Sequence, residues 1–401
     1  MNNRERTALV PKLRFPEFFS TGEWQKYRLD EIADRITEKV GYKDLTTLSI
    51  SAGIGFVSQV EKFSRDISGK QYENYIHLRK GDFSYNKGNS KKFPQGCIYE
   101  LKEYEEAAVP NAFISFHFND DYVSSFYKGY FDNNFHGKQL ARFITSGARS
   151  DGLLNISPTN FFSIILPTPK EKDEQQKIAD CLSSLNDLIT AEGKKLEALK
   201  AHKKGLMRKL FPTEGKTVPE WRFPEYRGEW EERKLGDVCT SIFSGKSKKS
   251  TKNEIFPLIG STGQIGFCDT ADYSGELILI ARVGANAGQV NFYTGKCGVS
   301  DNTLILNVNT ANIIGIFLRK WLDNFNINKL IFGSGQPLVT GGQLKNIDIC
   351  IPRLTEQQKI ADFLSALDTL ITAQAEKIKT LKLHKKGLMQ GLFPSIEEVS
   401  E

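Results

Sequence analysis

The sequence predicts an α+β protein in which two globular domains are separated by two long antiparallel coiled-coil helices, arranged as a pseudo-two-fold internal repeat. Three observations predict this fold. A 39-residue segment occurs twice, both copies carry a heptad pattern, and short β-branched and aromatic runs precede each copy. With 401 residues the chain is also too long for one typical hydrophobic core.

The repeated segment runs from Glu174 to Pro212, "EQQKIADCLSSLNDLITAEGKKLEALKAHKKGLMRKLFP", and again from Glu356 to Pro394. Aligned without a gap, 26 of the 39 positions are identical, which indicates duplication. A shorter repeat, "RFPEF" and "RFPEY", opens each half, and we expect it to tie the start of each domain against the end of a helix. The predicted parts are a first domain (1–170), a first helix (171–212), a second domain (213–352), and a second helix with the C-terminal tail (353–401).

Both copies of the segment carry apolar residues at alternating spacings of three and four, which places them on one face of a helix. A helix of about 40 residues is about 60 Å long and would expose this face unless the other copy covers it. Antiparallel pairing lets the chain return along the first helix. The predicted seam residues are Ile178, Leu182, Leu185, Ile189, Leu196, Leu199, Leu206 and Leu210 in the first copy, and Ile360, Leu364, Leu367, Ile371, Ile378, Leu381, Leu388 and Leu392 in the second.

Polar residues interrupt this seam at matching positions. Glu192 corresponds to Gln374, and Lys203 to Lys385. Such residues either fix the register of the pair or mark places where the seam opens to water, and the sequence leaves both interpretations open.

The segments that precede the helices read as loop-rich α+β domains. Residues 82–100 and 277–295 occupy corresponding places, as do 108–118 and 298–308, and their β-branched and aromatic runs bounded by Gly, Asn and Ser predict strands and turns. Residues 312–324 predict a helix after these strands. The two domains are only loosely alike, so one scaffold has been kept while its surfaces diverged.

The composition is that of a globular protein with a moderately basic balance, a formal net charge of +6. Six cysteines without a C-x-x-C pair predict reduced thiols, and there is no metal-ligand spacing. No apolar run approaches 18 residues and the N-terminus lacks a signal-peptide pattern, so we expect a soluble, cytoplasmic protein that does not contact a membrane.

Lysine-rich loops suggest a polyanionic partner. A two-headed molecule suits a DNA duplex, in which Lys and backbone N–H groups hold phosphates while Arg, Asn and Gln read base edges. Plain solvated loops would have the same composition, so DNA contact stays open for each residue. The candidate DNA-binding residues are Lys87, Asn89, Ser90, Lys91, Lys92, Arg149, Lys246, Ser247, Lys248, Lys249, Arg282, Asn286 and Gln336.

The sequence shows no catalytic constellation. The "GKS" at 245–247 is not a P-loop, because Thr240 stands where that motif requires Gly. The five histidines do not cluster, and no Pro-Pro dipeptide is present for an amino-methyltransferase motif. These observations favour a binding protein and predict no catalytic residue, no metal site and no cofactor bound by this chain.

The duplicated "IILPTPKEKDEQQKIADCL" (164–182) and "IDICIPRLTEQQKIADFL" (347–364) closely resemble the specificity subunit of type I restriction–modification systems. The resemblance covers essentially the whole chain. The first copy departs from the family pattern by an extra residue and a Lys-Asp before Glu174, which we expect to shift the start of its helix.

This resemblance implies that each variable domain is a target-recognition domain that reads one half of a bipartite, asymmetric DNA site. The helices would fix the unread gap and dock two modification (methyltransferase) subunits, while two restriction (motor and nuclease) subunits complete the complex. S-adenosylmethionine, ATP and Mg²⁺ would bind those partner subunits, and the specificity subunit itself would be non-catalytic.

Several alternatives stay open at this point. The lysines of the two "HKKGLM" segments, Lys203, Lys204, Lys385 and Lys386, would face DNA, a partner subunit or water. A methyltransferase fused to its own recognition domain, or a structural linker without affinity for DNA, would be built on a similar repeat.

Overall fold

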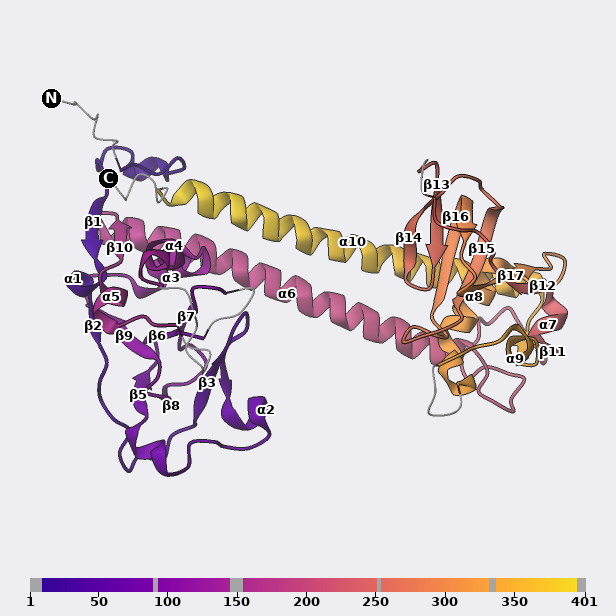
Figure 1. Ribbon diagram of the computed structural model, residues 1–401, viewed down its shortest axis with the longest axis horizontal. Helices are drawn as coiled ribbons and strands as arrows, with labels where there is room; N and C mark the ends of the chain where they lie inside the picture. Colours follow the sequence, from indigo (N-terminus) through magenta and orange to yellow (C-terminus); the bar gives the residue numbers. More distant parts are fainter. Residues whose placement is uncertain (1–8, 89–92, 145–153, 251–253, 332–336, 395–401) are drawn as a thin grey trace. The chain divides into compact units, whose positions relative to one another are not determined.

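A computed structural model describes residues 9–88, 93–144, 154–250, 254–331 and 337–394 (Figure 1). The chain divides into two compact units. Unit 1 comprises Met1–Ala191 and Ile378–Glu401, and unit 2 comprises Glu192–Lys377. Each unit therefore combines a globular part with part of both long helices, whereas the sequence-based division treated the helices as separate segments.

Unit 1 contains ten strands in its described residues: β1 (Gln25–Arg28), β2 (Ala33–Arg35), β3 (Leu48–Ser51), β4 (Gly55–Ser58), β5 (Ile76–Arg79), β6 (Phe83–Asn86), β7 (Cys97–Glu100), β8 (Glu106–Val109), β9 (Ile114–Phe118) and β10 (Ile165–Thr168). Its helices outside the repeat are α1 (Leu29–Ile32), α2 (Gln59–Phe63), α3 (Ser124–Asp132), α4 (Phe135–Leu140) and α5 (Pro158–Phe162), with 3-10 turns η1 (Pro16–Phe18), η2 (Gly69–Asn74) and η3 (Ala141–Phe143).

The described residues of unit 2 form eight strands: β11 (Glu231–Lys234), β12 (Cys239–Ser244), β13 (Phe256–Gly260), β14 (Gly263–Cys268), β15 (Tyr273–Ala281), β16 (Val290–Val299), β17 (Thr303–Val308) and β18 (Asp348–Ile351). Its shorter helices are α7 (Leu235–Val238), α8 (Gly315–Asn324), η4 (Ile327–Leu330) and α9 (Gly341–Lys345).

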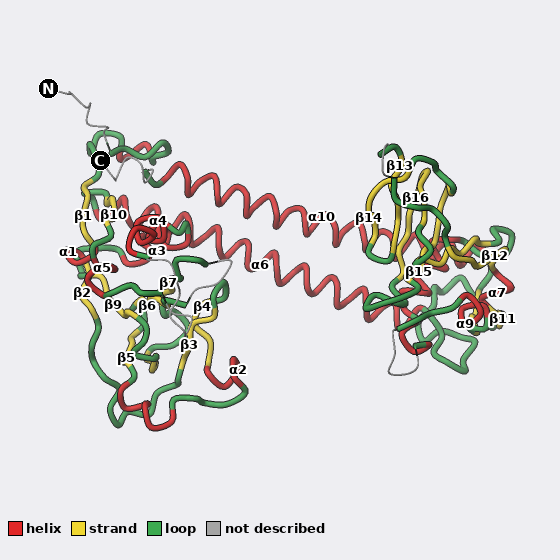
Figure 2. Tube along the Cα trace, in the orientation of Figure 1, coloured by secondary structure: helices red, strands yellow, loops and turns green. Residues whose placement is uncertain are grey.

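Each unit has its own core sheet, and the two sheets have the same strand order. In unit 1 the strand order is β2-β9-β6-β7, and in unit 2 the corresponding strands follow the order β12-β17-β15-β16. Unit 2 extends this sheet by β13 and β14 beyond β16 (Figure 2). Unit 1 instead carries two separate strand pairs, β3-β4 and β5-β8. The predicted strands and the helix at 312–324 are confirmed, although α8 begins three residues later than expected.

The two long helices, α6 (Lys172–Leu210) and α10 (Leu354–Leu392), are equally long and both end two residues before a proline that cannot continue a helix. Each begins two residues before its repeated glutamate, so the expected shift of the first helix is wrong. The extra residue is taken up by the connection from β10 to α6, which has three residues, 169–171, whereas only 352–353 join β18 to α10.

The helices are antiparallel within each unit, because the start of one shares a hydrophobic core with the end of the other. In unit 1, Ile178 and Leu182 of α6 pack in one cluster with Leu392 and Phe393. In unit 2, Ile360 of α10 packs in one cluster with Leu210 and Phe211. Burying such side chains contributes about 1.5–3 kcal/mol each, so every globular part depends on both helices.

A buried arginine–glutamate pair joins each "RFPE" segment to the first turn of a long helix. Arg14 donates to both carboxylate oxygens of Glu174 at 2.7 Å, and Arg222 makes the same two bonds, also at 2.7 Å, to Glu356. The neighbouring backbone binds the end of the other helix: Leu13 N donates to Gly391 O at 2.8 Å and Trp221 N to Lys209 O at 2.9 Å. This confirms the packing role expected for the segment.

The glutamine that follows each glutamate caps a helix of the globular part. Gln175 Oε1 accepts from Val123 N at the start of α3, and Gln357 Oε1 accepts from Ile314 N at the start of α8, both at 2.9 Å. These N–H groups have no partner within their own helix, so the amide satisfies a donor that burial would leave unpaired. The repeated Glu-Gln pair therefore secures two segments of the globular part to one helical turn.

Replacing Arg14 by Met is expected to lower the free energy of unfolding of unit 1 by about 3–5 kcal/mol, because Glu174 would be left charged and buried. The Glu174 side chain is 0% exposed, and that of Arg14 6%. Urea unfolding followed by tryptophan fluorescence checks this. Arg28→Met is the matched control, since the Arg28–Asp30 pair is exposed and should contribute less than about 1 kcal/mol. Equal losses in both variants would contradict the structural role of the buried pair.

Candidate nucleic-acid interface

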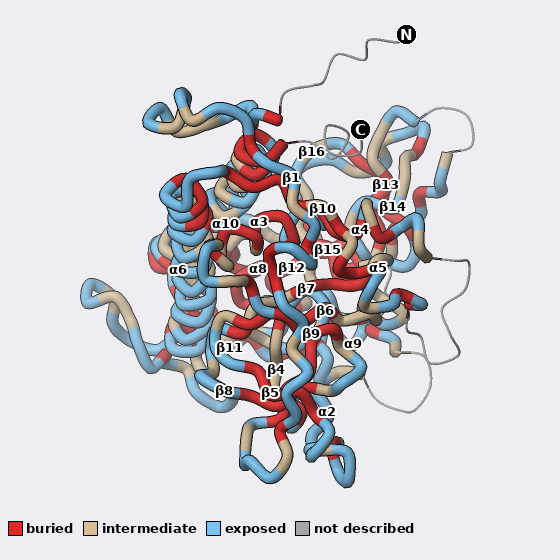
Figure 3. The backbone as a smooth tube through the Cα atoms, turned by 90° about the vertical axis from the view of Figure 1, so that its left-hand side faces the viewer, coloured by how far each residue is buried: buried red, intermediate tan, exposed pale blue. Residues whose placement is uncertain are grey.

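The predicted seam residues are all covered to some degree. Fully buried are Ile178, Leu182, Leu210, Ile360, Leu364 and Leu392, and half-buried are Leu185, Ile189, Leu196, Leu199, Leu206, Leu367, Ile371, Ile378, Leu381 and Leu388. The exposed residues of α6 lie on the side of the helix opposite to these seam residues (Figure 3). Which of these side chains meet across a seam stays a prediction.

The matching polar positions bind each other. Gln374 Nε2 donates to the backbone oxygen of Glu192 at 2.9 Å and to its carboxylate at 2.6 Å, while Lys377 Nζ lies 2.5 Å from the same carboxylate. The hydrogen bonds from Gln374 and Lys377 lower the pKa of Glu192. Equivalent residues of two antiparallel copies face each other only at one register, so this pair favours the register-fixing interpretation.

The matching lysines are also paired with acids. In unit 2, Lys203 Nζ lies 2.5 Å from Asp368 Oδ1, and the buried Lys320 of α8 contacts the other oxygen. Burial raises the pKa of Asp368, but the hydrogen bonds from the two lysines outweigh it, so the pKa is lowered. In unit 1, Lys385 Nζ lies 3.5 Å from Asp132 Oδ2 at the end of α3. Lys203 and Lys385 thus join helix to globular part, whereas Lys204 and Lys386 are exposed.

Six of the candidate DNA-binding residues lie outside the described residues: Asn89, Ser90, Lys91, Lys92, Arg149 and Gln336. The structure places the others as follows.

The lysine loop after β12 presents three of its four candidates to solvent. Lys246, Lys248 and Lys249 are exposed, whereas Ser247 is buried. The Ser247 hydroxyl donates to Asp272 and accepts from Val299 N at 3.1 Å. Its role is therefore to anchor the loop to the sheet, while the three lysine side chains stay exposed to solvent.

Two further candidates lie after β15. Arg282 is half-buried, and its Nη1 donates to Ser244 Oγ at 3.2 Å. Asn286 is exposed in the turn before β16 and lines a depression of about 410 Å³ with Gln289 and Asn328. Amide side chains of this kind can pair with base edges.

The candidate Lys87 of unit 1 follows β6 and is half-buried. It lines a depression of about 380 Å³ with Asn155, Ser157 and Asn160. Ser157 caps α5 by accepting from Asn160 N at 3.1 Å, which holds this wall of the depression in place.

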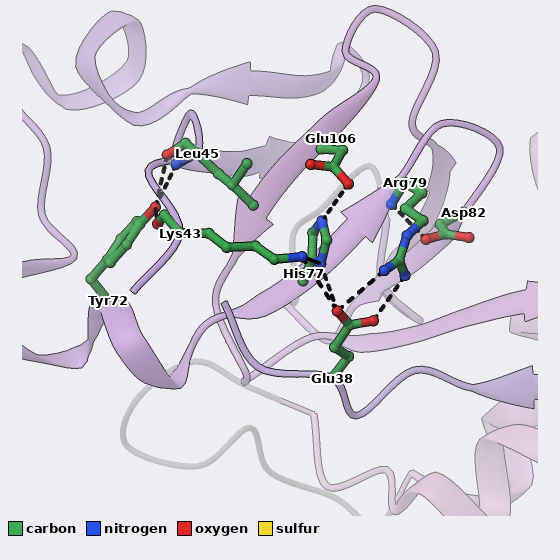
Figure 4. Close-up of polar contacts among 8 residues, drawn as sticks. All are labelled: Glu38, Lys43, Leu45, Tyr72, His77, Arg79, Asp82 and Glu106. Atoms are coloured by element: carbon green, nitrogen blue, oxygen red, sulfur yellow. Dashed lines mark hydrogen bonds and ion pairs between the residues drawn. The ribbon is translucent and has the colours of Figure 1, made fainter. Parts of the chain in front are cut away.

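The structure contains a polar cluster around His77 (Figure 4). The sequence did not predict it, because its members are far apart in the chain. The buried ring lies between two carboxylates: Nδ1 is 2.9 Å from Glu38 Oε1, and Nε2 is 3.2 Å from Glu106 Oε1 without hydrogen-bond geometry. Arg79 also binds Glu38, at 2.9 and 3.2 Å. Hydrogen bonds from Arg79 and His77 lower the pKa of Glu38 to about 2. The cluster holds the β5-β8 pair against the connection between β2 and β3, which contains Glu38.

Among the described residues, no group of three or more His, Cys, Asp or Glu side chains is placed to hold a metal ion. The six cysteines are unpaired thiols. Within the same part of the chain, no helix has the length and apolar character needed to cross a membrane.

Comparison with known proteins gives concordant results. Residues 227–383 match the family model of the type I restriction modification DNA specificity domain. A putative type I restriction enzyme MjaX specificity subunit of Methanocaldococcus jannaschii is 26% identical over 294 residues, which span 69% of this chain and 68% of that protein. The MjaVIII specificity subunit of the same organism is 27% identical over 285 residues, 63% of this chain and 66% of that protein.

The fold is similar to the crystal structure of a type I restriction–modification S subunit from M. genitalium, with a TM-score of 0.63 at 16% identity, over 96% of this chain and 99% of that one. The paired helices and the repeated sheet of this chain agree with these matches. The chain is therefore similar to the specificity subunits of type I restriction–modification systems.

Replacing Glu38 by Gln is expected to destabilise unit 1 in a pH-dependent way. The pKa of Glu38 is about 2 in the folded protein against an ordinary 4.5, so its ion pairs stabilise the fold above that ordinary value and are lost as the pH falls toward 2. The unfolding temperature of Glu38→Gln should therefore lie below that of the wild type at about pH 6, and the gap should narrow at about pH 3. A constant gap, or the same trend in the exposed control Glu73→Gln, would contradict this.

Proposed function

We propose that this chain is the non-catalytic DNA-specificity subunit of a type I restriction–modification system. Its two units would read the two halves of a bipartite, asymmetric DNA target, one half each. The observation that carries the proposal is the shared sheet order, β2-β9-β6-β7 in unit 1 and β12-β17-β15-β16 in unit 2, with different residues after the matched strands. A kept scaffold with changed loops is what two readers of different sequences require. The basic loops of both units support contacts to the phosphate backbone.

The long helices would fix the number of unread base pairs between the half-sites and dock two modification subunits. The similarity of the two helical copies, which are identical at 26 of 39 positions, supports this, because two copies of one partner need two similar surfaces. Two restriction subunits would complete the complex. S-adenosylmethionine, ATP and Mg²⁺ would bind these partners, and none of them would bind this chain. With DNA as its target, the subunit would act in the cytoplasm.

Mapping N6-methyladenine by long-read sequencing tests this function. The chain is co-expressed with its modification subunit, and the expected result is a split motif with two short specified halves around a fixed unspecified gap. A continuous motif would contradict separate readers. A soluble complex that neither methylates nor binds DNA would favour a structural linker instead. Methylation by the isolated chain would favour a fused enzyme.

Exchanging residues 1–170 for the first domain of another specificity subunit should change one half of the methylated motif and leave the other half and the gap unchanged. The reason is that each unit carries its own core sheet and its own loops. The control exchanges residues 213–352 and should change the opposite half. A change of both halves by either exchange would show that the units do not read independently.

A further inference from the structure

The residue that directly follows the matched central strand is basic in both units. β6 ends at Asn86 and is followed by Lys87, and β15 ends at Ala281 and is followed by Arg282. Both strands lie between the same neighbours in the core sheet, β9 and β7 in unit 1 and β17 and β16 in unit 2. The two cations therefore occupy equivalent places on one scaffold.

The backbone of Arg282 is held on both sides. Its N–H donates to Asn302 O at 2.9 Å, and its carbonyl oxygen accepts from Val339 N at 2.8 Å. Two residues later, Gly284 N donates to Pro337 O at 3.1 Å. The Val339 segment leads directly into α9, whose N-cap Thr340 forms a capping box with Gln343. Arg282 thus projects from a point at which three segments of unit 2 converge.

The side chain of Arg282 is positioned as well as its backbone. The half-buried guanidinium donates through Nη1 to Ser244 Oγ, the last residue of β12. A guanidinium carries five N–H donors in a rigid fork, so one bond to a hydroxyl orients the group and leaves donors for a second partner. A fork held in this way loses little side-chain entropy on binding.

The surroundings of Arg282 match the chemistry of a DNA groove. Lys246 is exposed two residues beyond Ser244, and Lys248 and Lys249 follow it, which supplies charge for phosphates. Phosphate contacts by these flexible lysines place a protein on the duplex but carry no sequence information. Reading a base requires a rigid donor pair beside them, and arginine matches the O6 and N7 acceptors of guanine.

We propose that Arg282 selects a guanine in the half-site read by unit 2, and that Lys87 occupies the corresponding reading position in unit 1. This rests on the proposed function, since it names the side chain that specifies one base of that target. Lys246, Lys248 and Lys249 contact phosphates and do not specify a base.

The test compares methylated motifs of complexes formed by the co-expressed modification subunit with wild-type chain or with Arg282→Gln. Glutamine pairs with adenine instead of guanine, so one G·C position in one half of the motif should relax or change to A·T. Discrimination at that position should fall by about 5- to 150-fold, the value of one bidentate pair. The other half and the gap should be unchanged. The matched control, Lys248→Ala, should lower the extent of methylation and keep every position of the motif.

Unchanged discrimination in Arg282→Gln, relaxation in both halves, or a wild-type half-site made only of A·T pairs would overturn the assignment. If Arg282→Gln yields no folded complex by gel filtration, Arg282→Lys decides. It keeps the charge but lacks the fork, so discrimination at the same position should fall at least about fivefold, and no fall would overturn the assignment. A wild-type complex without a split motif would instead refute the proposed function itself.

Discussion

A buried arginine–glutamate pair at the first turn of each long helix organises this molecule. Arg14 and Arg222 each reach across more than a hundred residues of chain to bind Glu174 and Glu356. Taking both charges out of water is unfavourable unless every hydrogen bond is made, so the pair tolerates one geometry. That geometry places the opening segment of each unit between the start of one helix and the end of the other. The caps made by Gln175 and Gln357 then position α3 and α8 on the same turn.

Much of the architecture could be predicted because the repeat can be recognised from short-range sequence patterns. Heptad spacing and the "RFPE" motif are short-range signals, and the two long helices follow from them. The β-branched and aromatic runs likewise predicted the strands within residues 82–118 and 277–308. The common sheet order could not be predicted, because it depends on pairings such as Phe83 with Phe116 that join distant segments of dissimilar sequence. The buried Lys320 is a further example: only the structure shows Asp368 at its amino group.

The candidate interface divides in the same way. Composition identified the lysine loop after β12, but it could not tell that Ser247 is buried while its neighbours are exposed, because that difference depends on Asp272 and Val299. The sequence predicted Lys87 and Arg282 as DNA-binding candidates, but it could not show that they occupy equivalent positions after β6 and β15, since their neighbours in sequence differ. The His77 cluster was missed because the pairing of β5 with β8 brings Glu106 to His77, and a separate contact of β5, in which His77 N donates to Glu38 O at 3.0 Å, brings Glu38 there.

The opening segments also have a consequence for the order in which the protein can fold during synthesis. In unit 2 the end of α6 and Trp221 are close in the chain, and the contact between them forms as soon as both have been made. In unit 1 the same contact joins Leu13 to Gly391, and Phe393 fills the space above Gly129. Domains made first usually fold first on the ribosome. Here the unit that is begun first can be completed only after Gly391 and Phe393 have been added.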